Sequence, residues 1–96
     1  MKTKVVVIDG GGRGAALIHA YSKSPLVDEL IAIPGNDLMP TLTKKKVTIY
    51  PELKTTSLQE ILEICQKEKP SLIDVAQDNA VEAGLTDLLR TNGFNV

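Results

Sequence analysis

A run of β-branched residues turns directly into glycines near the start of this chain, and this junction severely limits the possible folds. Thr3–Ile8 reads T-K-V-V-V-I, and Gly10–Gly12 follow after one aspartate. Continuous apolar character is typical of a strand buried on both faces, as in a parallel sheet. Leu17, Ile18 and Tyr21 then recur at helical spacing until a Ser-Pro pair stops the helix. A buried strand followed at once by a helix predicts an α/β fold.

The same alternation of strands and helices continues along the chain. Ser57 and Glu60 form a capping box, which predicts a second helix that runs to the next proline. Asn79 and Glu82 predict the start of a third helix, with Asn92–Gly93 as its stop. Further strands are predicted at Glu29–Ile33, Lys46–Ile49, Leu72–Ala76 and, as a strand that only begins, Phe94–Val96. This order predicts an open, mostly parallel Rossmann-like sheet with helices on both faces and right-handed crossovers.

Composition excludes several classes of partner. The 96 residues carry 11 Lys+Arg and 12 Asp+Glu, a formal net charge of −1, which lacks the basic footprint of a nucleic-acid binder. The longest apolar run, Val5–Ile8, is too short to span a membrane. One cysteine, Cys65, excludes a disulfide scaffold and fits a reducing compartment. We therefore expect a cytoplasmic domain that binds neither nucleic acid nor membrane.

The glycine junction is a candidate anion site. The first N–H groups of a helix are unpaired and its dipole is positive there, so Gly11 and Gly12 offer donors to a phosphate and Arg13 adds a positive charge. Glycine also lets a phosphate approach the backbone closely. Asp9 opposes an anion unless its carboxylate turns away or accepts backbone hydrogen bonds within the loop. A tight strand-to-helix turn without a ligand is the structural alternative.

The motif Gly-x-Gly-x-x-Ala, which begins at Gly10, also matches a loose dinucleotide-binding fingerprint. A dinucleotide site needs an acidic residue at the end of the second strand, about 20 residues further on. Pro34–Asn36 stand there instead, with Asp37 slightly beyond, which weakens the dinucleotide interpretation. The Pro34–Asn36 turn either offers backbone N–H groups and an amide to a ligand or is a plain β-turn.

Polar residues also follow the fourth strand. In open α/β sheets, ligands bind outside the carboxyl ends of the strands, so segments 9–13, 34–37 and 77–79 are expected to converge on one edge, with the first and fourth strands as central neighbours. Asp78 either accepts hydrogen bonds from sugar hydroxyls or caps the next helix. His19 has no partner at metal-ligand spacing, and Cys65 lies in an apolar stripe. We therefore assign no metal ligand and no catalytic residue to these 96 residues.

Two stretches of the chain resemble a known family. V-V-V-I-D-G-G-G-R-G-A-A-L and S-P-L-V-D-E-L-I-A-I-P-G-N resemble the amino-terminal, pre-ATP-grasp type domain of phosphoribosylamine–glycine ligase, also called glycinamide ribonucleotide synthetase. That family has Gly-Asn-Gly-Gly-Arg-Glu-His-Ala-Leu at the first stretch, Ala-Pro-Gly-Asn at the second, and Val-Gly-Pro-Glu-x-Pro-Leu where this chain has V-A-Q-D-N-A-V. The resemblance runs over essentially the whole chain, and the separation of the two loops makes it more specific than either motif alone.

The resemblance implies a role for each matching position. It implies that the loops bordering a phosphoribosylamine site are formed by Gly11, Gly12, Arg13, Pro34, Gly35 and Asn36. Asp78 stands at the family's Glu, which implies a shorter carboxylate directed toward the ribose hydroxyls. The chain departs from the family at Asp9 and Gly10 for Gly-Asn, at Gly14 and Ala15 for Glu-His, and at Gln77 and Ala80 for two prolines. These departures indicate a divergent branch that binds phosphoribosylamine or a related ribose phosphate.

The resemblance also implies a larger enzyme. The family joins phosphoribosylamine to glycine in de novo purine biosynthesis with ATP and magnesium, and an ATP-grasp domain that follows this one holds the ATP. Residues 1–96 are therefore expected to form one amino-terminal substrate-binding domain, truncated before its ATP-grasp partner, without a cofactor of its own and inactive alone. Two alternatives stay open, a dinucleotide-binding Rossmann module and a non-catalytic interaction domain.

Overall fold

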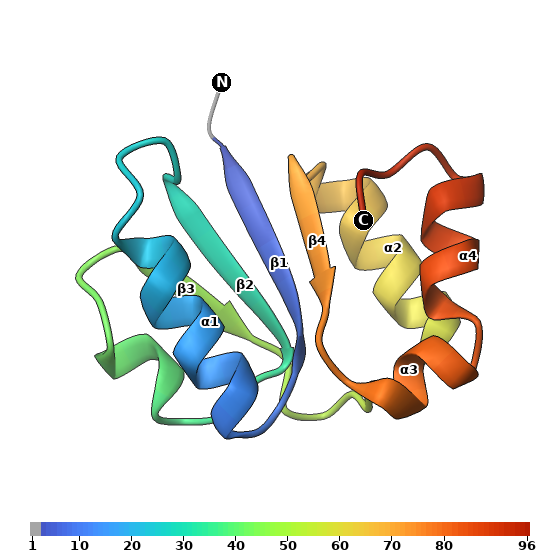
Figure 1. Cartoon of the computed structure of the whole chain (residues 1–96), viewed down its shortest axis with the longest axis horizontal. Helices are drawn as coiled ribbons and strands as arrows, with labels where there is room; N and C mark the ends of the chain where they lie inside the picture. Colours follow the sequence, from blue (N-terminus) through green and yellow to red (C-terminus); the bar gives the residue numbers. More distant parts are fainter. Residues whose placement is uncertain (1–2) are drawn as a thin grey trace.

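A computed structural model describes residues 3–96 of the chain. Strands and helices alternate as an α/β fold requires, with one short 3₁₀ helix, η1, inserted after the second strand (Figure 1). In chain order the elements are β1 (Lys4–Asp9), α1 (Gly12–Ser22), β2 (Glu29–Pro34), η1 (Met39–Thr41), β3 (Lys46–Ile49), α2 (Leu58–Glu68), β4 (Leu72–Val75), α3 (Asp78–Glu82) and α4 (Leu85–Thr91). No helix within residues 3–96 is long and apolar enough to cross a bilayer.

The four strands form one parallel sheet in the order β3-β2-β1-β4. In its register, Asp9 lies opposite Pro34 and Ile8 lies opposite Val75. From β1 the chain passes through α1 to β2 on one side, and it later passes through α2 to β4 on the other side of β1 (Figure 1). The direction of winding therefore reverses between β1 and β4, which is where open α/β sheets leave a crevice for ligands. The predicted parallel α/β sheet is confirmed.

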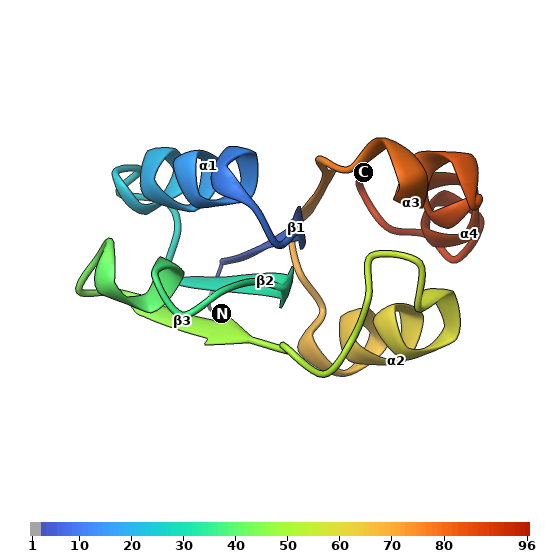
Figure 2. The same ribbon diagram turned by 90° about the horizontal axis from the view of Figure 1, so that it is seen from below.

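Helices cover both faces of this sheet, as predicted. The strands alternate their side chains between two apolar clusters, because successive residues of a strand point to opposite faces. Figure 2 shows α1 on one face and α2 on the other. On the α1 side the buried cluster is Val5, Val7, Ala15, Ile18, Val27, Leu30, Ala32 and Met39. On the α2 side, where α4 also packs, it is Val6, Ile8, Ile31, Ile33, Ile61, Leu62, Cys65, Ile73, Ala80, Leu85 and Leu89.

The β4 end of the sheet differs from the prediction. β1 and β4 are neighbours as expected, but β4 is the edge of the four-stranded sheet and not a central strand. Residues 94–96 do not form the predicted fifth strand. Their one backbone hydrogen bond to the sheet runs from the Ile73 N–H to the Asn95 carbonyl, 2.9 Å away. A single bond aligns the segment with β4 but does not build a ladder.

Two details of the helices also differ from the prediction. Ser57 is the N-cap of α2, but its hydroxyl accepts a 3.0 Å hydrogen bond from the Lys54 N–H, so the capping box with Glu60 does not form. The predicted third helix is divided into α3 and α4 at Gly84, whose φ of +92° is left-handed and ends the first segment. Gln77, rather than Asp78, is the N-cap of α3.

Candidate functional site

The three polar segments singled out in the sequence meet at the carboxyl edge of the sheet. Figure 1 shows the strand arrowheads, the start of α1 and the start of α3 together at this edge. The Gly35 N–H donates to the Asp9 carbonyl over 3.1 Å, and the Asn36 side-chain amide donates to the Gly10 carbonyl over 3.1 Å. The loop after β1 is therefore bonded to the loop after β2, and the predicted convergence is confirmed.

The loop after β4 is tied to the same place by two side chains. The Arg13 guanidinium donates to the Ala76 carbonyl over 2.9 Å, and the Gln77 side-chain amide donates to the Asp9 carboxylate. Both bonds cross from β1 and α1 to the β4–α3 connection, which is where the winding of the sheet reverses. Because Arg13 is exposed, its remaining N–H groups face solvent at this edge.

The glycine loop keeps free donors at the positions predicted from the sequence. The N–H groups of Gly11, Gly12 and Arg13 have no acceptor among residues 3–96, whereas the Gly14 N–H donates to the Asp9 carboxylate over 2.5 Å. A Cβ added at Gly12 would meet no atom within 4 Å. The start of α1 therefore has open space beside unpaired N–H groups, as an anion site requires.

Asp9 does not block this site with a free charge. Its side chain is 1% exposed, and its carboxylate accepts from the Gly14 N–H and from the Gln77 amide. The sequence left open whether Asp9 would turn away or accept hydrogen bonds within the loop, and it accepts them. Gly14, which the resemblance marked only as a departure, is thereby part of the loop's structure.

The turn after β2 mostly stabilises its own shape. Gly35 has a φ of +73°, and a Cβ there would lie 2.6 Å from Cγ2 of Ile49, so only glycine fits. Besides its bond to Gly10, Asn36 accepts the Leu38 N–H over 3.0 Å. One of its amide hydrogens is left for a ligand. Its predicted role as a ligand contact stays a prediction.

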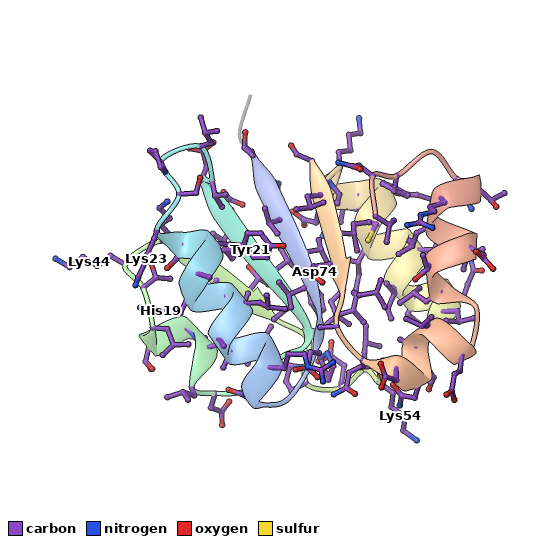
Figure 3. All side chains as sticks on the ribbon, viewed as in Figure 1. His19, Tyr21, Lys23, Lys44, Lys54 and Asp74 are labelled. Atoms are coloured by element: carbon purple, nitrogen blue, oxygen red, sulfur yellow. The ribbon has the colours of Figure 1, made fainter. Side chains whose placement is uncertain are left out.

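The remaining part of the edge is more exposed. Asp78 is exposed at the start of α3, and its carboxylate makes no hydrogen bond or ion pair with the described residues. The Thr55 hydroxyl donates to the Asn79 side-chain oxygen over 2.9 Å, which brings the β3–α2 loop to this edge. Figure 3 shows Lys54 of that loop beside α3. Sequence reasoning missed this loop, because no local signal pairs Thr55 with a residue 24 positions away.

Two hollows lie elsewhere on the molecule. A pocket of about 420 Å³ between α1 and η1 is lined by Ala15, Ala16, His19, Leu38, Thr41 and Leu42. A second one lies beside β4, where the Tyr21 hydroxyl donates to the Asp74 carboxylate over 2.7 Å (Figure 3). Burial and this carboxylate raise the pKa of Tyr21 to about 12. Neither hollow contains a predicted site residue, and within residues 3–96 no group of three or more His, Cys, Asp or Glu side chains is placed to hold a metal.

Comparisons with known proteins agree on one family. The family described as phosphoribosylglycinamide synthetase, N domain, matches residues 3–96. Over 94 residues the chain is 36% identical to the phosphoribosylamine–glycine ligase of Archaeoglobus fulgidus, covering 95% of this chain and 20% of that protein. The ligase of the same name from Synechocystis is 37% identical over 97% of this chain and 22% of its own length, and the one from Escherichia coli O157:H7 is 32% identical over 97% and 21%. The chain thus spans about a fifth of the length of these relatives.

Proposed function

Because the chain belongs to the phosphoribosylglycinamide synthetase N-domain family, we propose that it is the amino-terminal substrate-binding domain of a phosphoribosylamine–glycine ligase. One observation carries the proposal: the loops after β1, β2 and β4 are hydrogen-bonded to one another at the carboxyl edge. In this proposal the ligand is phosphoribosylamine or a related ribose phosphate. Its contacts come from Gly11, Gly12, Arg13, Pro34, Gly35, Asn36 and Asp78.

The chemistry of the edge fits the parts of such a ligand. The free N–H groups at Gly11 and Gly12 and the guanidinium of Arg13 are donors, which suit phosphate oxygens. Asp78 offers an exposed carboxylate, which suits sugar hydroxyls. A phosphorylated sugar amine has a phosphate and hydroxyl groups. One ligand of this class therefore contacts the loop after β1 through its phosphate and the loop after β4 through its hydroxyls.

The ligase reaction uses ATP and magnesium to activate glycine, and this chain spans about a fifth of the length of its ligase relatives. We therefore propose that ATP and magnesium belong to an ATP-grasp domain that follows this one, and that residues 1–96 alone catalyse no ligation. A cytosolic location is also proposed, and the single, buried and free thiol of Cys65 supports it.

The dinucleotide alternative is less well supported. Such a site uses an acidic side chain at the end of the second strand to bind a ribose hydroxyl. Here β2 ends at Pro34, and the following Asn36 side chain is bonded to Gly10 and Leu38. The end of β2 therefore has no carboxylate where a dinucleotide site uses one, and the nearest acidic residue, Asp37, lies three positions beyond the strand.

A titration of the ¹⁵N-labelled chain tests the proposal. Ribose 5-phosphate is expected to shift the amide signals of Gly11–Gly14 and Gly35 with weak, millimolar affinity, since a single domain provides part of a closed site. NAD and inorganic sulfate serve as the comparison ligands. If NAD shifts these signals at lower concentration, the dinucleotide module is the better interpretation. If none of the three ligands shifts them, the interaction-domain interpretation replaces both.

A further inference from the structure

The buried carboxylate of Asp9 has no role in the family resemblance, yet it lies at the centre of the site. Asp9 is the last residue of β1 and is 1% exposed. Its two oxygens accept from the Gly14 N–H in α1 and from the Gln77 side chain after β4, while its carbonyl accepts the Gly35 N–H after β2. One residue thus contacts all three loops of the edge.

Asp9 is sterically compatible only with glycine at position 14. A Cβ built on Gly14 would lie 2.7 Å from the Asp9 Cβ and 2.7 Å from its Oδ2, closer than real Cβ atoms approach other atoms. The Asp9 Cβ is fixed to the backbone of β1, and the carboxylate end is buried and held by two donors, so neither atom can move aside freely. Asp9 and a side chain at position 14 therefore exclude each other in this backbone.

We propose that Asp9 and Gly14 are one coupled positioning pair that holds the glycine loop in the shape its ligand requires. The resembling family motif has glycine where this chain has Asp9, and glutamate where it has Gly14. In this chain the carboxylate extends from the strand and is turned inward onto the protein's own donors. The two departures from the family motif, at positions 9 and 14, then depend on each other and count as one change. The positioning role of the pair rests on the proposed sugar-phosphate site.

The exchange has a consequence for the ligand. With the Asp9 carboxylate bonded internally, the loop keeps unpaired donors at its surface: the N–H groups of Gly11, Gly12 and Arg13 and the remaining N–H groups of the guanidinium. Such donors favour anionic acceptors such as phosphate oxygens over ammonium groups, which cannot accept a hydrogen bond. Asp9 therefore sets the specificity of the loop without contacting the ligand.

A double-mutant cycle tests the coupling without any ligand. Gly14→Ala is expected to lower the melting temperature by about 8 °C or more, because the overlap with Asp9 forces a backbone shift. Asp9→Gly is also expected to lower it, through loss of the two bonds to Gly14 and Gln77. The double variant Asp9→Gly/Gly14→Ala is expected to melt within about 3 °C of Asp9→Gly, since the Cβ then has room. If the losses in melting temperature of the two single variants add up in the double variant, Asp9 and Gly14 are not coupled.

Ligand affinity tests the positioning role. At a temperature where every variant is folded, Asp9→Gly is expected to weaken ribose 5-phosphate binding about tenfold. Asp9→Asn has the same shape, keeps an acceptor for the Gly14 N–H and can pair with a flipped Gln77 amide, so it is expected to stay within about threefold of wild type. Leu62→Ala, a core truncation in α2, is the control for lost stability and is expected to leave the affinity unchanged.

Each result then decides one claim. If Asp9→Gly binds as tightly as wild type, or if Leu62→Ala weakens binding equally, Asp9 has no positioning role. If wild type itself does not bind ribose 5-phosphate, the proposed function is wrong, and the melting temperatures of the cycle still decide whether Asp9 and Gly14 are coupled.

Discussion

The Arg13 guanidinium donates to the Ala76 carbonyl over 2.9 Å, although 63 residues separate the two in sequence. This bond spans the carboxyl ends of β1 and β4, where the strand order changes direction. One N–H of Arg13 therefore fixes the β4–α3 connection, and in the proposed function the remaining N–H groups bind the anion. The bond holds the side chain at the edge before any ligand arrives, which lowers the entropy lost on binding.

Replacing Arg13 tests its part in anion binding. Arg13→Ala is expected to weaken ribose 5-phosphate binding by roughly 1.5–3 kcal/mol, about 10- to 150-fold, the range for a hydrogen bond to a charged group. Arg90→Ala is the matched control, because Arg90 is also exposed and also donates to a backbone carbonyl, that of Val96. An NMR titration of the three proteins measures the affinities. Equal affinities for wild type and Arg13→Ala would contradict a role in binding.

Gly12→Ala tests whether the open space beside Gly12 is needed by a ligand and not by the folded protein. No atom lies within 4 Å of a Cβ at Gly12, so the substitution is expected to change the free energy of unfolding by less than about 1 kcal/mol. It is expected to weaken ribose 5-phosphate binding about tenfold, since the methyl group occupies the approach to the loop N–H groups. Urea denaturation and the same titration give the two quantities. Wild-type affinity in this variant would mean that the loop is only a turn.

Gly35→Ala is predicted to be among the most damaging single changes at the edge. The left-handed φ of +73° costs an alanine about 1–2 kcal/mol, and the 2.6 Å approach to Ile49 adds about 1–3 kcal/mol of overpacking. Gly84→Ala is the control, because φ there is +92° and a Cβ meets nothing within 4 Å. Urea denaturation is expected to show a clearly larger loss for Gly35→Ala. Equal losses would show that the packing against Ile49 is unimportant.

The stability of the chain is predicted to fall in alkali through Cys65. Burial raises the pKa of this thiol from 9.0 to about 12, so the folded state keeps the proton that the unfolded state releases. The contribution is complete below pH 9 and is lost as pH rises from 9 toward 12, with a slope of up to about 1.4 kcal/mol per pH unit. The difference in unfolding free energy between wild type and Cys65→Ala should therefore shrink between pH 8.5 and 10.5. A difference that stays constant over this range would contradict the prediction.

Most of the sheet was predictable because its signals are local. The continuous apolar runs of β1 and β2 and the apolar stripe of α2 are local sequence patterns, and β3 was predicted with its observed bounds at Lys46–Ile49. The errors arose where two local signals compete. Ser57 has the right spacing for a capping box, but its hydroxyl bonds back to Lys54. Gly84 stands inside a helical pattern, and whether it breaks the helix depends on a backbone angle that periodicity does not report.

The site was predictable in its location but not in its internal bonding. Parallel strands bring their carboxyl ends to one edge, so the meeting of Arg13, Asn36 and Asp78 with their loops followed from topology alone. The Thr55–Asn79 contact and the Asp9–Gly14 bond depend on side-chain directions in three dimensions. The Asp9–Gly14 bond still has a sequence pattern: an aspartate ends a strand, and a buried glycine follows five residues later in the next helix. This pattern can be used to look for the same bond in other sequences.

The 2.7 Å overlap at Gly14 also restricts the order in which such sequences can diverge. Between glycine at position 9 with glutamate at position 14 and the present arrangement, an intermediate with side chains at both positions is expected to be destabilised by this overlap. The route with the smaller loss of stability passes through glycine at both positions. Such an intermediate has no carboxylate at either position, and its loop lacks the two bonds by which Asp9 holds Gly14 and Gln77.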